Sequence, residues 1–168
     1  MLSKAFKFIV FATVIMMCLI LEANGQMSMT DKNSLQGITR LIVVVENIEP
    51  EIERDVIERS TIQTDVELKL RMAGVKVINS FDNNSLEGPH YIYVNINILK
   101  IDEFQYVYNI NVKLIQGVML IRNDELCLAT TWSDTYLGFA GTLKQESIRD
   151  SIKELVDNFI IDYLDMNQ

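Results

Sequence analysis

The chain has 168 residues, a formal net charge of −8 from 15 Lys and Arg against 23 Asp and Glu, and 49% hydrophobic residues. This length and hydrophobic content fit one domain with a sizeable core. An acidic chain repels phosphate backbones and anionic lipid surfaces, and the sequence has no basic cluster to offset the repulsion. We therefore expect no nucleic-acid partner.

The first 25 residues are typical of a secretory signal. Lys4 and Lys7 form a basic start, and residues 8–21 are almost entirely apolar. Residues 23–25 (Ala-Asn-Gly) then place small residues at the two positions that a signal peptidase reads. The apolar run is shorter than the roughly 20 residues that span a bilayer. We expect cleavage near Gly25 and a periplasmic or secreted product with no membrane span.

Two alternatives to cleavage stay open. An uncleaved signal would anchor the domain to the membrane, and Cys18 could carry a lipid, although Met17 before it is not the usual small residue. Residues 26–37 are polar and aperiodic, which predicts a flexible leader before a single domain at 38–168. Cys127 is the one cysteine beyond the signal, and its apolar neighbours predict a buried side chain.

A strand–helix–strand unit is expected first. Residues 41–45 form an apolar run without polar alternation, typical of a central strand, and a turn at Pro50 closes it. Ser60 and Gln63 have the spacing of a capping box, and Gly74 is placed to end the helix in a left-handed cap. The strand that follows at Val75–Ile78 should lie parallel to the first.

Residues 91–100 and 105–115 carry the clearest strand pattern, because apolar and polar residues alternate with period two. A hairpin centred on Glu103 puts both apolar sets on one face, whereas a slip of one residue would expose half of them. The asparagines that this register brings opposite each other are Asn97 with Asn109 and Asn95 with Asn111.

The remaining elements complete the sheet and cover it. Gln116–Gly117 indicates a bulge or bend, residues 118–121 continue the strand, and residues 126–132 form the last strand after a turn. Residues 133–141 are expected to be an irregular loop. A helix from about residue 143 to 165, with Thr142 and Gln145 able to cap it, carries a wide apolar stripe and should lie across the sheet.

The expected fold is therefore α+β with the order β-α-β-β-β-β-α, in which one mixed sheet has two helices packed on one face. The face that carries the asparagines would be left to solvent or to a partner.

Residues 63–78 (QTDVELKLRMAGVKVI) resemble a helix–Gly–strand unit of small bacterial envelope domains. These include the amino-terminal domain of the Tol translocation protein TolB, and the curli-secretion and penicillin-binding-protein-activator lipoproteins. The resemblance covers this unit and the general order of elements, about half of the mature chain. It implies a small α/β fold that serves in assembly or docking and is not an enzyme. No functional residue can be carried over.

The chemistry-bearing residues do not form a known motif. His90 is the only histidine, and we expect it at a loop end on the surface. Ser133, His90 and Asp134 contain the residue types of a catalytic triad, but Ser133 lacks the glycine-flanked elbow that exposes a serine nucleophile. We expect no enzyme activity, no metal and no cofactor.

Seven residues are candidates for contacts with a partner. The polar set is Asn95, Asn97, Asn109 and Asn111, and the aromatic set around the expected loop is Trp132, Tyr136 and Phe139. The favoured function is an exported, non-enzymatic interaction or assembly module of the cell envelope that binds a protein or peptide. The alternative is a periplasmic domain that binds a small ligand between the terminal helix and the sheet.

Overall fold

The computed structural model describes residues 32–80, 89–102, 105–140 and 145–167. In chain order these residues form β1 (Arg40–Val45), α3 (Pro50–Asp55), α4 (Arg59–Met72), β2 (Lys76–Val77), β3 (His90–Lys100), β4 (Tyr106–Leu120), β5 (Glu125–Ala140) and α5 (Gln145–Asn167). The described strands make one sheet in the order β2-β1-β3-β4-β5. β1 is parallel to both of its neighbours, and the β3–β4 and β4–β5 pairs are antiparallel.

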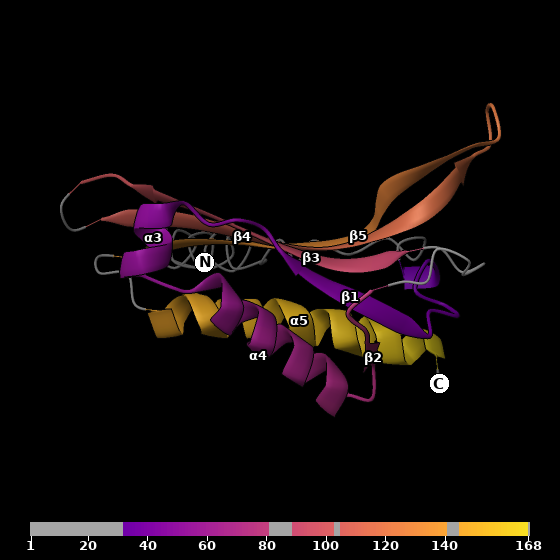
Figure 1. Cartoon of the computed structure of the whole chain (residues 1–168), viewed down its shortest axis with the longest axis horizontal. Helices are drawn as coiled ribbons and strands as arrows, with labels where there is room; N and C mark the ends of the chain where they lie inside the picture. The colour runs from indigo at the N-terminus through magenta and orange to yellow at the C-terminus, as the bar shows by residue number, and fades with distance from the viewer. Residues whose placement is uncertain (1–31, 81–88, 103–104, 141–144, 168) are drawn as a thin grey trace, which may run out of the picture.

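The fold is the mixed α+β arrangement that the sequence predicts. α4 and α5 form a layer on one face of the sheet, and α5 runs across it (Figure 1). The core lies between these two layers, because the alternating apolar residues of the strands meet the apolar stripes of the helices. The most completely buried members include Ile92, Val94, Ile110, Val112 and Leu114 from the strands, and Ile62, Leu70, Ile148, Val156 and Phe159 from the helices.

The predicted end of α4 is confirmed, but its predicted start is wrong. Gly74 has a φ of +85°, and the Val75 amide donates to the Leu70 carbonyl at 3.0 Å, which makes the left-handed cap. At the other end Glu58 is the N-cap residue, and Ser60 lies inside the first turn instead of preceding it. Its hydroxyl donates to the Glu58 carboxylate at 3.4 Å, so Ser60 makes no capping box.

The turn expected at Pro50 is a short helix, α3. Pro50 occupies a position in the first turn of that helix, where its fixed φ is suitable and its missing N–H is not needed. Pro50 therefore indicates the start of a helix as well as a turn. α3 lies near the end of β3 that leads to β4 (Figure 1).

The predicted β3–β4 register is confirmed. Asn95 lies opposite Asn111 and Asn97 lies opposite Asn109, as the parity of the two strands requires. Glu103, at the centre of the hairpin, lies outside the described residues. So do the expected signal at residues 1–25 and the capping residue Thr142.

The predicted loop at residues 133–141 is wrong, because β5 continues to Ala140 and pairs with β4 along its length. Gly138 explains the loop-like composition. A Cβ at this position would collide with the ring of Tyr108 on the neighbouring strand, so a larger residue here would force that ring to move. The glycine therefore indicates close packing within a strand and not a break in it.

The bulge lies elsewhere than predicted. Gln116 and Gly117 pair regularly with Ala129 and Leu128, and the register shift falls between Leu114 and Ile115. These two residues pair with Trp132 and Thr130, so the extra residue is Thr131 on β5. An extra residue reverses which side chains face each side, and this turns Trp132 toward the helices.

Residues 32–37, expected to be part of a flexible leader, are packed against the domain. Leu35 is fully buried, and Lys32 forms an ion pair with Asp162 of α5. The Asn167 side-chain amide donates to the Leu35 carbonyl at 2.9 Å, and its oxygen accepts from the Gly37 amide at 2.8 Å. The folded domain therefore begins before Ile38.

None of the described helices is both long enough and apolar enough to be a candidate membrane span.

Candidate functional site

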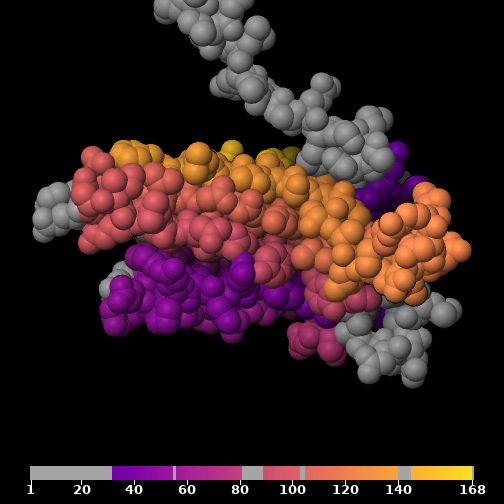
Figure 2. Space-filling model, turned by 90° about the horizontal axis from the view of Figure 1, so that it is seen from above, coloured from indigo at the N-terminus to yellow at the C-terminus, as the bar shows by residue number. Residues whose placement is uncertain are grey.

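The candidate site lies on the face of β3, β4 and β5 that points away from α4 and α5, which we call the open face. None of the described helices covers it, and Figure 2 looks onto it. The two registers align its side chains into rows across the three strands. Successive rows are Leu99–Val107–Phe139, Asn97–Asn109–Leu137 and Asn95–Asn111–Thr135.

The four predicted asparagines are brought together and form a connected hydrogen-bond network. Asn97 Nδ2 donates to Asn95 Oδ1 at 2.7 Å, and Asn111 Nδ2 donates to the same oxygen at 3.2 Å. Asn111 also donates to Asn109 Oδ1, and Asn109 Nδ2 donates to the Tyr136 carbonyl at 3.4 Å. Each amide orientation in the network therefore depends on its neighbours.

Glu46, directly after β1, fixes the direction of this network. Its carboxylate accepts a hydrogen bond from Asn95 Nδ2, and a carboxylate can only accept. The Asn95 amide oxygen must then point to Asn97 and Asn111. Glu46 also contacts the Tyr93 hydroxyl, and burial together with this hydrogen bond raises the pKa of Tyr93.

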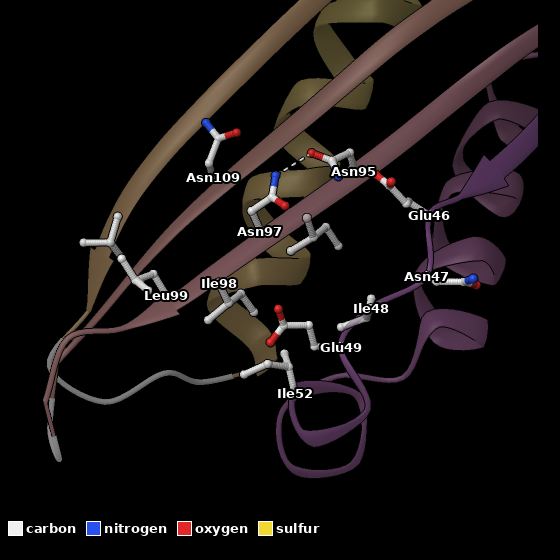
Figure 3. Close-up of a pocket in the computed structure, with 12 residues that line it drawn as sticks. Glu46, Asn47, Ile48, Glu49, Ile52, Asn95, Asn97, Ile98, Leu99 and Asn109 are labelled. Atoms are coloured by element: carbon white, nitrogen blue, oxygen red, sulfur yellow. Dashed lines mark hydrogen bonds between the residues drawn. The ribbon is translucent and has the colours of Figure 1, made fainter.

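A pocket of about 420 Å³ lies beside the network, between the β1–α3 connection and the strands β3 and β4 (Figure 3). A volume of this size is in the range of small-ligand sites. Its polar lining is Glu46, Asn47, Glu49, Asn95, Asn97 and Asn109, and its apolar lining is Ile48, Ile52, Ile96, Ile98, Leu99 and Val107. The pocket therefore combines two carboxylates with an aliphatic wall.

The aromatic set does not share one surface. Trp132 is buried in the core, where its indole N–H donates to Asp162 at 3.0 Å and its ring meets Phe159 edge to face. Tyr136 is half-buried on the same side and stacks on Tyr108. Phe139 alone of the three lies on the open face, because its position in β5 has the opposite parity.

The site differs from the alternative pocket expected between the terminal helix and the sheet. Trp132, Phe159 and Ile152 are buried between α5 and the strands, and these core side chains fill that space. The pocket described above instead lies at the edge of β3, between that strand and the β1–α3 connection.

Sequence reasoning did not connect Glu46 and Glu49 with the asparagines. They follow β1, almost fifty residues before Asn95, and are brought to the asparagines because β1 pairs in parallel with β3. Acidic residues after a strand carry no signal for such a pairing, so local pattern could not have found them.

The other chemistry-bearing residues stay apart. His90 is half-buried in the first position of β3, not in a surface loop, and it faces the helix side, whereas Ser133 lies on the open face. Cys127 is half-buried in the β4–β5 hairpin beyond the core. Within the described residues, no three His, Cys, Asp or Glu side chains gather as metal ligands.

Comparisons with known proteins find similarity to solved structures. No family model matches the chain, and no curated protein matches its sequence. A crystal structure of a minor lipoprotein from Acinetobacter baumannii is similar at 12% identity and a TM-score of 0.32, over 73% of this chain and 87% of that one. These values are too low to assign this chain to the family of that lipoprotein.

Proposed function

We propose that this protein is an exported, non-enzymatic interaction module of the cell envelope, and that it binds a partner protein or peptide through the open face. The export part is supported by the basic start, apolar run and small-residue exit within residues 1–25. The binding part is supported by the open face itself.

The observation that carries the proposal is a row of exposed apolar side chains next to the asparagine network. Leu99 is 67% exposed, Phe139 is 64% exposed and Leu137 is 71% exposed. Leu99, Val107 and Phe139 stand side by side across three strands, and Leu137 lies in the next row. Contiguous apolar surface of this kind is typical of sites that a partner covers.

Site-specific photo-crosslinking tests the proposal. A photoreactive amino acid at Leu137 samples the open face, and the same amino acid at Leu68 of α4 is the matched control, since Leu68 is also an exposed leucine at 55%. We expect a discrete crosslinked partner in the envelope fraction from Leu137 and not from Leu68. Loss of this crosslink in Phe139→Ser would map the contact to the open face. Equal crosslinking from both positions, or none from Leu137, contradicts the proposal.

The export part has its own test. The amino-terminal residue of the protein isolated from the periplasm or medium should be Gln26, determined by mass spectrometry. A mature chain that still begins at Met1 would support the membrane-anchored alternative.

The second candidate function is binding of a small ligand, and the 420 Å³ pocket favours it. The pocket adjoins the apolar row, since Leu99 and Val107 belong to both. Pocket and row can therefore serve one binding event, in which a partner inserts a side chain.

A further inference from the structure

We infer that the pocket beside the asparagine network binds a primary ammonium group on an aliphatic chain. The inference rests on the proposed binding role of the open face and names the chemistry that the face recognises. Three observations support it: the direction of the hydrogen bonds in the network, the charge of the lining and the aliphatic nature of the apolar wall.

The hydrogen-bond network sets the direction of one acceptor of the pocket lining, the Asn97 amide oxygen. Glu46 fixes Asn95, and Asn95 Oδ1 in turn accepts one hydrogen of Asn97 Nδ2. The Asn97 amide oxygen consequently points away from Asn95 (Figure 3). An acceptor in this position is satisfied by a ligand that donates hydrogen bonds.

The charge of the lining selects a cation among the donors. Glu46 and Glu49 both line the pocket, and the twelve lining residues include no Lys, Arg or His. Figure 3 shows Glu49 projecting from the loop before α3 toward the side of Ile98. Two carboxylates in one pocket, with no basic side chain among the lining residues, raise the local concentration of cations.

Two basic residues lie near the pocket, but neither of them supplies the cation for its carboxylates. Arg59 Nη1 donates to Asn47 Oδ1 at 3.1 Å, and the Asn47 side chain points away from the strands in Figure 3. Lys113 lies on the open face opposite Tyr93, in the row beyond Asn95 and Asn111, and does not line the pocket.

The apolar wall selects the body of the ligand. Ile52, Ile98, Leu99 and Val107 line the pocket, and all of them are aliphatic. A methylene chain can lie along this wall while its terminal ammonium reaches the carboxylates and the Asn97 oxygen, as lysine stems do on apolar surfaces. A lysine side chain of a bound peptide and a free alkyl diamine both have this chemistry.

Nuclear magnetic resonance titration of the folded protein tests the inference. The probes are Nα-acetyl-lysine methylamide and 1,5-diaminopentane, and the neutral controls of similar shape are Nα-acetyl-norleucine methylamide and pentan-1-ol. We expect saturable shifts of the Asn95, Asn97 and Asn109 side-chain amide signals with the amines. Tighter binding of the lysine derivative would identify a peptide as the source, and tighter binding of the diamine a free ligand.

A pair of matched variants separates local recognition from general charge. Glu49→Gln removes a carboxylate of the pocket, and Glu51→Gln removes the same charge two residues on, outside the lining. We expect Glu49→Gln to weaken amine binding about tenfold, in line with loss of a charge-assisted hydrogen bond. Glu51→Gln should change it by less than about twofold, since an exposed charge outside the pocket contributes little. Both are exposed, so both variants should fold, with unchanged thermal midpoints.

Three results would overturn the inference: no saturable shift, equal shifts with the neutral controls, or equal weakening by the two variants. None of them depends on the crosslinking experiment. Amine binding without a crosslinked partner would support the pocket assignment and contradict the proposal of a partner protein. A crosslinked partner without amine binding would support the partner protein and contradict the pocket assignment.

Discussion

The two faces of the sheet are built from the same strands but are stabilised differently. The helix side is a dry core in which Trp132 and Phe159 pack between α5 and the strands. The open face holds its polar side chains in a hydrogen-bond network and leaves large apolar ones in contact with water. The difference indicates that the helix side maintains the fold, and it supports the binding role that we propose for the open face.

The largest expected effect compares two leucines on the two faces. Leu114→Ala removes a fully buried side chain of β4 and should lower the free energy of unfolding by about 2–5 kcal/mol. Leu137→Ala, on the open face of β5, should change it by no more than about 0.5 kcal/mol. Urea denaturation measures both. Similar losses would mean that the open face is part of the core.

The second prediction concerns the buried polar contact of the helix side. Asp162 accepts a hydrogen bond from Trp132 and pairs with Lys32, so Asp162→Asn should destabilise the fold by about 1–3 kcal/mol. The control is Asp157→Asn, because Asp157 is 55% exposed and its ion pair with Lys69 contributes at most about 1 kcal/mol. Urea denaturation measures both losses of unfolding free energy. A smaller loss for Asp162→Asn than for Asp157→Asn would show that this buried contact does not stabilise the fold.

The third prediction is a pH dependence between the two helices. The Arg149 guanidinium lies 2.6 Å from Asp65 and lowers the pKa of that carboxyl below its ordinary value of 3.8. The pair therefore stabilises the fold above this value, and the contribution is lost as the pH falls through the lowered pKa. Asp65→Asn should cost about 0.5–1 kcal/mol at about pH 7, after allowance for solvent screening.

The same variant should cost less at about pH 2 than at about pH 7, because a larger fraction of the wild-type carboxyl is then protonated. Thermal unfolding at both pH values measures the difference. A cost that does not change with pH would show that Asp65 acts through packing and not through its charge.

The smallest expected effect on stability belongs to the asparagine network. Asn97→Thr keeps a residue that suits a strand and should change the free energy of unfolding by no more than about 0.5 kcal/mol. The same variant should weaken amine binding severalfold, because it removes the oxygen that faces the pocket. A large loss of stability with unchanged binding would reverse the roles that we assign to the two faces.

Much of the fold follows from local pattern. The alternation in β3 and β4 predicted the pairing of Asn95 with Asn111, since any other parity would expose apolar residues. The left-handed cap at Gly74 was also predictable, because few other residues adopt that backbone conformation. The extension of β5 through residues 133–140 was not, because Gly138 makes room for the ring of Tyr108, which belongs to another strand.

The sequence by itself determined the expected class of fold, the hairpin register and the asparagine face, because burial of apolar residues with period two is a local property of the chain. Only the tertiary structure decided which side chains share the site. The extra residue at Thr131 turned Trp132 and Tyr136 inward and left Phe139 outside. The parallel pairing of β1 with β3 brought Glu46 and Glu49 to the asparagines. The bulge and the parallel pairing both depend on contacts between strands, and the local sequence pattern carries no information about such contacts.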